Sequence, residues 1–229
     1  MKKINFQAIA KNVVETEIKS LKRLKTNINK SFNKAVEAIL NCRNGKVIVS
    51  GVGKSGIIGK KISSTLSSVG TPSFFVDANE CSHGNLGQIA KNDVLILISF
   101  SGKSSELKNI IQYSKLKKIT LIGIVSKKNS LLYKNSDIKL LIPEVTEADP
   151  NGIVPTSSSI VQLSLGHCLC VATMKYKKFG KLDFKKFHPS GSLGAKLKTV
   201  EDLMTKNIPF INENTKIKKA LNTMSQKKL

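Results

Sequence analysis

The sequence predicts an α/β fold in which a parallel five-stranded sheet is flanked by helices, followed by a shorter tail of different character. Two observations support this. Strand-like apolar runs alternate with helical segments between residues 46 and 176, and the clearest run, Val-Leu-Ile-Leu-Ile at 94–98, is apolar throughout. Strands buried on both faces of a parallel sheet have this pattern. Ligands of such sheets bind beyond the carboxyl ends of the strands.

The predicted elements follow one another in regular order. Residues 3–43 contain no Gly or Pro and carry apolar residues near helical spacing, which predicts two helices that pack on the core. Asn44 and Gly45 end this segment. Strands are expected at 46–50, 72–76, 94–99, 118–125 and 138–142. Helices are expected at 54–68, 104–116 and 156–176, with a short one near Leu131. We expect the domain that they form to cover residues 44–195.

In the tail, residues 196–229, the sequence pattern predicts a strand at 208–211 and an amphipathic helix at 216–228. One strand and one helix cannot bury a core of their own. The tail is therefore expected to dock on another surface, or to be the opening of an incomplete domain.

The composition is that of a soluble cytoplasmic protein with no membrane partner. Of 229 residues, 40% are hydrophobic and 23% charged, and no apolar run is long enough to span a bilayer. The N-terminus lacks the apolar stretch of a secretory signal. The four cysteines have neither zinc-site nor disulfide-framework spacing: Cys42, Cys81, Cys168 and Cys170.

The formal net charge of +23 suggests a nucleic-acid partner, but the cations argue against one. Nearly all are lysines spread along the chain, and Arg23 and Arg43 are the only arginines. Few aromatic residues are available to stack on bases. We therefore expect no nucleic-acid partner and a positive field that attracts anionic metabolites.

The first candidate site is a hydroxyl-rich turn at residues 99–106, after the apolar run. Ser99, Ser101 and Ser104, together with the unpaired N–H groups of a helix start, form a cradle for an anion such as phosphate. Glu106 is expected one turn into that helix, close to whatever the phosphate anchors. The alternative is an ordinary serine-capped helix start.

A glycine-rich turn at residues 51–56 follows the first predicted strand. It matches neither the nucleotide-binding loop nor the dinucleotide fingerprint, but its glycines would let a ligand approach the backbone, and Lys54 offers a cation. The alternative is a glycine turn with a solvent-exposed lysine.

Two further segments carry candidate catalytic side chains. Glu147 lies in a loop just ahead of the helix start at Pro155, Thr156 and Ser157. Capping accounts for Thr156 and Ser157 but not for Glu147. His188 ends a helical segment. Single histidines of this kind, His83 included, are more often structural than catalytic, and His167 is interpreted as structural.

Together these segments supply a lysine, two carboxylates, a histidine and a phosphate cradle. This set fits proton transfer next to the carbonyl of a sugar phosphate, through an ene-diolate intermediate. The histidines and acids lack the spacing of metal ligands, so no metal ion is expected.

Several motifs in the same order resemble the sugar isomerase (SIS) domain family, and within it the D-arabinose 5-phosphate isomerases of the Kdo and lipopolysaccharide pathway. The resemblance extends over residues 5–229 and rests on segments 51–56, 71–75, 82–87, 101–106, 155–158 and 188–194. It implies a doubly wound three-layer sandwich and a reversible interconversion of D-ribulose 5-phosphate and D-arabinose 5-phosphate without a cofactor. It also implies a homotetramer with active sites at subunit interfaces.

The resemblance implies a role for each site residue. Glu106 or Glu147 moves the proton between C1 and C2, Lys54 stabilises the oxyanion, and His188 assists proton movement at the sugar oxygens, reaching in from a neighbouring subunit. The remaining positions would hold phosphate or hydroxyls or line the site: Gly53, Ser55, His83, Ser99, Ser101, Ser104, Thr156 and Ser157.

This chain departs from the family pattern at Phe100, where relatives carry Asn, and at Lys103, where they carry an acid. The tail from Val200 resembles the start of a tandem CBS pair that stops within its first repeat, so nucleotide regulation through CBS domains is not expected. Two other functions stay open: a sugar-phosphate sensor without turnover, and an isomerase for a hexose or amino-sugar phosphate. Retention of both glutamates favours catalysis.

Overall fold

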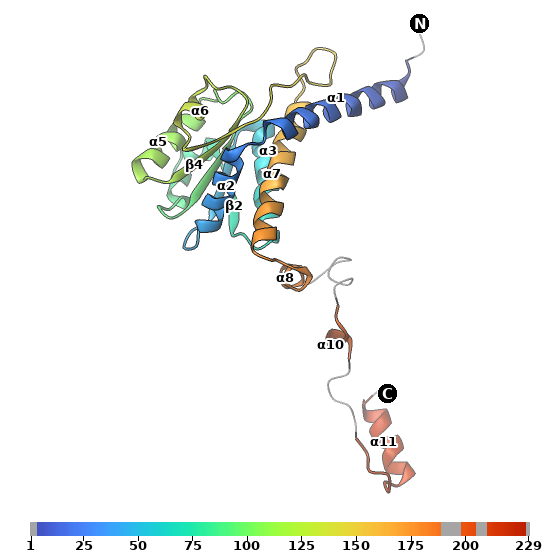
Figure 1. Ribbon diagram of the computed structural model, residues 1–229. Coiled ribbons are helices and arrows are strands. Elements are labelled where there is room, and N and C mark those ends of the chain that lie inside the picture. The colour runs from blue at the N-terminus through green and yellow to red at the C-terminus, as the bar shows by residue number, and fades with distance from the viewer. Residues whose placement is uncertain (1–3, 189–197, 205–209, 228–229) are drawn as a thin grey trace. The chain divides into compact units, whose positions relative to one another are not determined.

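A computed structural model describes residues 4–188, 198–204 and 210–227 of the chain (Figure 1). The chain divides into two units, Met1–Phe187 and His188–Leu229. In the first unit five strands form one parallel sheet in the order β2-β1-β3-β4-β5, which confirms the predicted fold class.

The strands are close to their predicted positions. They are β1 (Val47–Gly51), β2 (Ser73–Asp77), β3 (Val94–Ile98), β4 (Thr120–Val125) and β5 (Ile138–Leu141). The helices of this unit are α1 (Phe6–Asn27), α2 (Lys30–Asn41), α3 (Gly53–Ser68), α4 (Ala78–Cys81), α5 (Leu107–Lys117), α6 (Leu131–Asn135), α7 (Ser157–Tyr176) and α8 (Lys181–Phe187). A 3-10 turn, η1 (Asn85–Gln88), also forms. The sequence did not predict α4 or η1.

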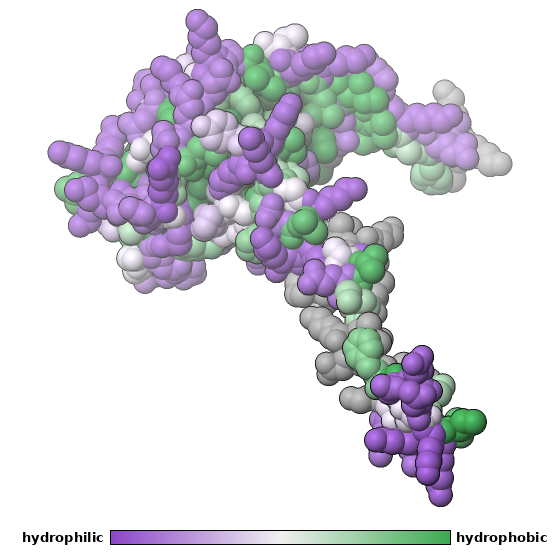
Figure 2. Space-filling model, turned by 60° about the horizontal axis from the view of Figure 1, so that its bottom comes forward, coloured by the Kyte–Doolittle hydropathy of each residue, from purple (hydrophilic) through white to green (hydrophobic). Residues whose placement is uncertain are grey.

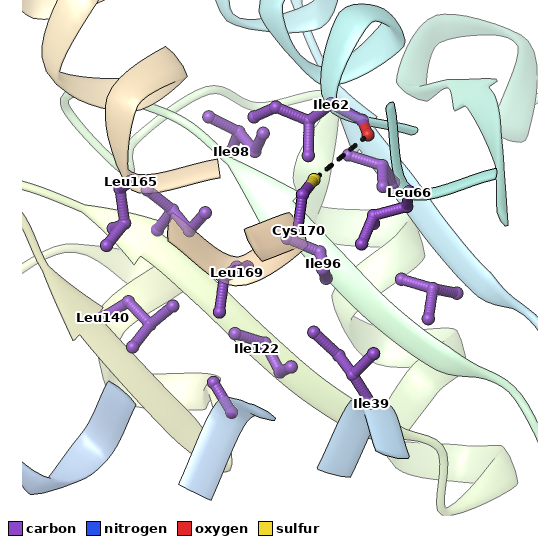
Figure 3. Packing of buried hydrophobic residues seen from close by; sticks show 14 of the residues in the cluster. Ile39, Ile62, Leu66, Ile96, Ile98, Ile122, Leu140, Leu165, Leu169 and Cys170 are labelled. Carbon is purple, nitrogen blue, oxygen red and sulfur yellow. Dashed lines mark hydrogen bonds between the residues drawn. The ribbon is translucent and has the colours of Figure 1, made fainter. Parts of the chain in front are cut away.

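Successive residues of the central strands point to opposite faces of the sheet, so each face has its own core. Val47, Val49 and Ile96 belong to the cluster that α2, α3 and α7 cover. Ile48 and Leu95 belong to the cluster on the other face, under α5 and α6. Figure 3 shows the first cluster, where Ile62 of α3 meets Cys170 of α7. The two covered faces make the three-layer arrangement.

The long helix α7 is a core element. It packs against α1, α2 and α3, and the Cys170 thiol donates to the Ile62 carbonyl at 3.9 Å. His167 also faces α3, with Nε2 3.0 Å from the Lys61 ammonium; burial and this ammonium lower the pKa of the imidazole. Among the described residues α7 alone is long and apolar enough to cross a membrane, but half of its most apolar stretch is buried inside the protein. Core helices of soluble proteins have the same composition.

The two N-terminal helices are present, but only part of α1 packs on the core. Leu24, near its C-terminal end, is buried, whereas Ile9, Val14 and Ile18 are exposed. Among these helices, α2 and the last turns of α1 are the parts that bury apolar side chains against the core. Helical spacing identified the apolar face of α1, but it could not predict how much of that face other helices would cover.

The second unit contains α10 (Val200–Leu203) and α11 (Ile217–Lys227) among its described residues. The predicted amphipathic helix is thus confirmed. The strand predicted at 208–211 falls partly outside the described residues, and Phe210 and Ile211, which are described, have no strand structure.

Candidate active site

The loops that carry the candidate residues leave the sheet at a common edge. Because all five strands are parallel, their carboxyl ends point the same way. Gly51, at the end of β1, pairs in register with Ile98 at the end of β3. The glycine turn and the serine-rich turn therefore begin side by side, where the sequence predicted a ligand site.

The glycines of the first loop have different roles. A Cβ on Gly51 would lie 2.8 Å from the Ile98 carbonyl oxygen, and one on Gly56 would lie 2.8 Å from the Gly51 oxygen. These two glycines therefore permit close packing of β1, β3 and α3, not the approach of a ligand. Gly53 differs: its φ is +57° and nothing lies within 4 Å of its missing side chain.

Lys54 follows in the first turn of α3, and its side chain is exposed. Within the described ranges its ammonium has no hydrogen-bond or ion-pair partner, so it is available to a ligand. Ser55, the next residue, is half-buried.

The serine-rich turn after β3 is compact. Ser99 Oγ accepts a hydrogen bond from Gly102 N at 3.0 Å and lies 3.2 Å from Ser104 Oγ, while Ser101 Oγ accepts from Lys103 N at 3.3 Å. Gly102 has a φ of +65°, and a Cβ there would lie 2.4 Å from Ser130 Oγ. Buried Ser99 thus shapes the turn, and exposed Ser101 and half-buried Ser104 lie nearer solvent.

The position of Glu106 differs from the prediction. α5 begins at Leu107, three residues later than expected, and Glu106 is its N-cap residue, not a residue one turn into the helix. The residues before it form a turn, in which Leu107 N and Lys108 N donate to the Ser104 and Ser105 carbonyls at 3.2 and 3.0 Å. Glu106 Oε2 accepts from Ser105 Oγ at 3.1 Å, and the side chain is partly exposed.

Glu147 provides the cap of α7. Its Oε2 accepts from Thr156 N at 2.8 Å, Thr156 Oγ1 at 3.1 Å and Ser158 N at 3.2 Å. Burial alone would raise the pKa of this carboxyl, but the hydrogen bonds from Ser158 and Thr156 outweigh it and hold the pKa below its ordinary value. The carboxylate is therefore kept ionised at a helix N-terminus.

The surroundings of Thr156 and Ser157 follow from this cap. Thr156 does not cap α7 with its side chain; its hydroxyl donates to Glu147 and accepts from Ala148 N at 2.8 Å. Ser157, expected to hold phosphate or a hydroxyl, is fully buried, and its Oγ has no partner among the described residues. Its burial does not support a direct substrate contact.

Asp149 is a residue whose role the sequence reasoning missed. Its carboxylate accepts from the backbone N–H groups of Asn151, Ile153 and Val154 at 2.8–3.0 Å, and these bonds lower its pKa. An Asp followed by Pro and, two residues later, Gly is a turn signal that could have identified it. Asp149 and Glu147 together fix the loop that leads into α7.

The two candidate histidines lie in different units. His83 is exposed after α4, and the hydrogen bond from Asn109 Nδ2 to Ser82 Oγ, 3.0 Å long, joins its segment to the first turn of α5. His188 begins the second unit and is half-buried.

Phe100 and Lys103, the two residues that differ from the family pattern, lie in different environments. The Phe100 side chain packs against the core cluster under α7, so an apolar residue fits there. Lys103 is exposed and adds a cation beside the serine-rich turn. Groups of three or more His, Cys, Asp or Glu side chains able to hold a metal ion are not found in the part of the chain that the structure describes.

Comparison with known proteins identifies relatives of nearly the whole chain. The family model of the SIS domain matches residues 39–172. The chain is 43% identical to the arabinose 5-phosphate isomerase KdsD of Francisella tularensis over 98% of its length and 71% of that protein. It is 41% identical to the protein of the same name from Yersinia pestis, over 99% of this chain and 70% of that one.

A solved structure has the same fold. The c3406 protein of E. coli CFT073, determined in complex with arabinose 5-phosphate, superposes with a TM-score of 0.78 and 36% sequence identity. The match covers 81% of this chain and all of that one.

Proposed function

The chain belongs to the SIS domain family, and on this premise we propose that it is an aldose–ketose isomerase that interconverts D-ribulose 5-phosphate and D-arabinose 5-phosphate. Relatives bearing the name arabinose 5-phosphate isomerase align over 98–99% of this chain, which includes every candidate site residue. A protein of similar fold binds arabinose 5-phosphate. The observation that carries the proposal is that the glycine-rich turn before Lys54 and the serine-rich turn begin side by side, at the ends of β1 and β3.

We propose that the substrate phosphate binds at the serine-rich turn. Ser101 and Ser104 lie at its solvent side, and the start of α5 adds a positive dipole end, although the first two N–H groups of that helix already donate to the Ser104 and Ser105 carbonyls. Lys54 on the neighbouring loop is unpaired within the described residues and stabilises the negative charge that develops on the sugar oxygens in the ene-diolate. Gly53, Ser55 and His83 line the same edge.

We assign the proton shuttle between C1 and C2 to Glu106, not Glu147. The Glu147 oxygen that caps α7 is already shared by three donors, and the lowered pKa makes this carboxylate a weak base. Glu106 accepts one bond, from the adjacent Ser105, among the described residues. Glu147 instead positions the loop that leads into α7, and its negative charge stabilises the N-terminus of that helix. His188 assists proton movement at the sugar oxygens.

We also propose a cytoplasmic homotetramer in which His188 reaches the active site of a neighbouring subunit. The exposed apolar residues of α1 support a subunit contact: Phe6 is 74% exposed, Ile9 54% and Val14 55%. All four cysteines are free thiols, which fits a reducing compartment.

A substrate panel tests the assignment. Purified protein is incubated with D-ribulose 5-phosphate, D-fructose 6-phosphate and D-glucosamine 6-phosphate, and the products are separated by chromatography. We expect D-arabinose 5-phosphate as the predominant product and little conversion of the six-carbon sugars. Turnover of a six-carbon sugar alone would indicate a different phosphosugar isomerase, and binding without any turnover would indicate a sensor.

A further inference from the structure

A cavity of about 660 Å³ lies at the carboxyl edge of β4 and β5. Three segments far apart in the sequence line it: Arg23 and Asn27 of α1, residues 126–129 after β4, and residues 141–144, which begin with the last residue of β5. Its volume is in the range of metabolite sites. None of its lining residues belongs to the proposed active site, and β3 lies between β4 and β1 in the sheet, although Ser126 bonds to the Phe100 carbonyl in the serine-rich turn.

The cavity carries an excess of positive charge. Arg23, Lys127 and Lys128 face one carboxylate, Glu144, which gives a formal excess of two positive charges. Glu144 forms an ion pair with Lys127. Within residues 4–188, 198–204 and 210–227, the Arg23 guanidinium and the Lys128 ammonium have no hydrogen-bond or ion-pair partner. Two cations are thus left without a counter-charge.

The identity of one cation is informative. The chain has only two arginines among 38 basic residues, and Arg23 is one of them. Arginine presents a planar fork of N–H donors that matches phosphate and carboxylate oxygens, whereas lysine acts as a point charge. Asn27 and Asn129 add amide groups that can bond hydroxyls, while Leu141, Ile142 and Pro143 provide an apolar wall.

The walls are held in place by the protein itself. Ser126 donates from N and from Oγ to the Phe100 carbonyl, at 2.9 and 2.6 Å. Ser130 Oγ donates to the Lys127 carbonyl at 2.7 Å, and Ile142 N donates to the Val125 carbonyl at 3.0 Å. A ligand would therefore meet a preformed backbone and would not have to order a loop.

We propose that this cavity is a second binding site, which takes a phosphorylated small molecule with Arg23 and Lys128 as its anion ligands. The inference rests on the charge, volume and fixed walls of the cavity and does not depend on the isomerase activity.

Isothermal titration calorimetry with inorganic pyrophosphate at low ionic strength tests the proposal. The cavity variant is Arg23→Gln with Lys128→Gln. The control, Lys22→Gln with Lys25→Gln, removes the same charge from exposed positions of α1 that do not line the cavity. Circular dichroism and thermal unfolding verify that both variants are folded.

We expect the cavity variant to bind one pyrophosphate per chain fewer than the wild-type chain, or to bind that equivalent about tenfold more weakly or worse, while the control binds as the wild type does. If the serine-rich turn does not bind the probe, the wild type binds one equivalent and the cavity variant none, so the two proposals fail separately. Equal binding by the cavity variant and the wild type overturns the proposal. So does equal loss in the control, or no binding by the wild type.

Discussion

Two glutamates that the sequence presents as equals have different surroundings. Glu147 closes the N-terminus of α7 through three hydrogen bonds to one oxygen, whereas Glu106 stands at the N-cap of α5 with one bond from its neighbour Ser105. A carboxylate stabilised by helix-start donors holds structure, and a less restrained one can move a proton. Single substitutions separate these roles.

Glu106→Gln should lower kcat by about a hundredfold or more, because it removes the group proposed to transfer the proton. KM and the unfolding temperature should change little, since no long-range hydrogen bond of this side chain is found among the described residues. Glu80→Gln, on an exposed residue of α4, is the matched control. Steady-state kinetics provide the measurement, and activity within a few-fold of wild type for Glu106→Gln would contradict the assignment.

Glu147→Gln should destabilise the fold by roughly 1–2 kcal/mol near pH 7, because it weakens charged hydrogen bonds. The folded-state pKa of Glu147 is below its ordinary value of 4.5, so its stabilising contribution is present above that pH and is lost as the pH falls through the folded pKa. The difference in unfolding temperature between wild type and variant should be constant from pH 8 to 6 and shrink below about pH 4.5. A difference that grows on acidification would exclude this role; Glu37→Gln, on an exposed residue of α2, is the control.

Among the elements, the α3–α7 pair connects the site to the core. The first turn of α3 carries Lys54, the start of α7 binds Glu147, and both helices cover the same face of the sheet. Their contact is close at Gly166, where a Cβ would lie 2.3 Å from Ile62 Cδ1. Ile62 is fully buried (Figure 3), so it has little room to yield.

Gly166→Ala should therefore destabilise the protein by about 1–3 kcal/mol, although alanine is the better helix former. Gly180→Ala is the control, because it meets nothing within 4 Å and has no positive φ. Combining Gly166→Ala with Ile62→Ala, which removes all three Ile62 carbons that the new Cβ would meet, should cost less than the sum of the two single substitutions. Denaturant unfolding measures both effects, and a neutral Gly166→Ala would show that the helices separate easily.

For the whole molecule, much of the architecture was predictable because it depends on the hydrophobic pattern of short sequence segments. Continuous apolar runs identified β1, β3 and β4, and alternation with helical segments gave a parallel sheet whose carboxyl edge collects the candidate residues. Contacts between distant segments were not predictable in this way. Glu147 capping Thr156 and Ser158, the burial of Ser157, and the cavity between α1 and two strand ends all depend on how loops fold back.

The distribution of basic residues along the chain is the basis for expecting anionic metabolites as partners. Figure 2 shows hydrophilic side chains over much of one face, interrupted by hydrophobic areas, and the basic residues are spread along the whole chain. We expect the net charge of +23 to create a positive potential that attracts phosphorylated substrates in general, while the proposed site at the edge of the sheet would provide specificity.

The most direct test of the central claim is isomerisation of D-ribulose 5-phosphate in deuterated water, followed by NMR of the product. A carboxylate that exchanges its proton with solvent during an ene-diol step should place deuterium at C2 of D-arabinose 5-phosphate. Absence of the product, or product that stays free of deuterium at C2 after many reversible turnovers, would contradict the proposed chemistry.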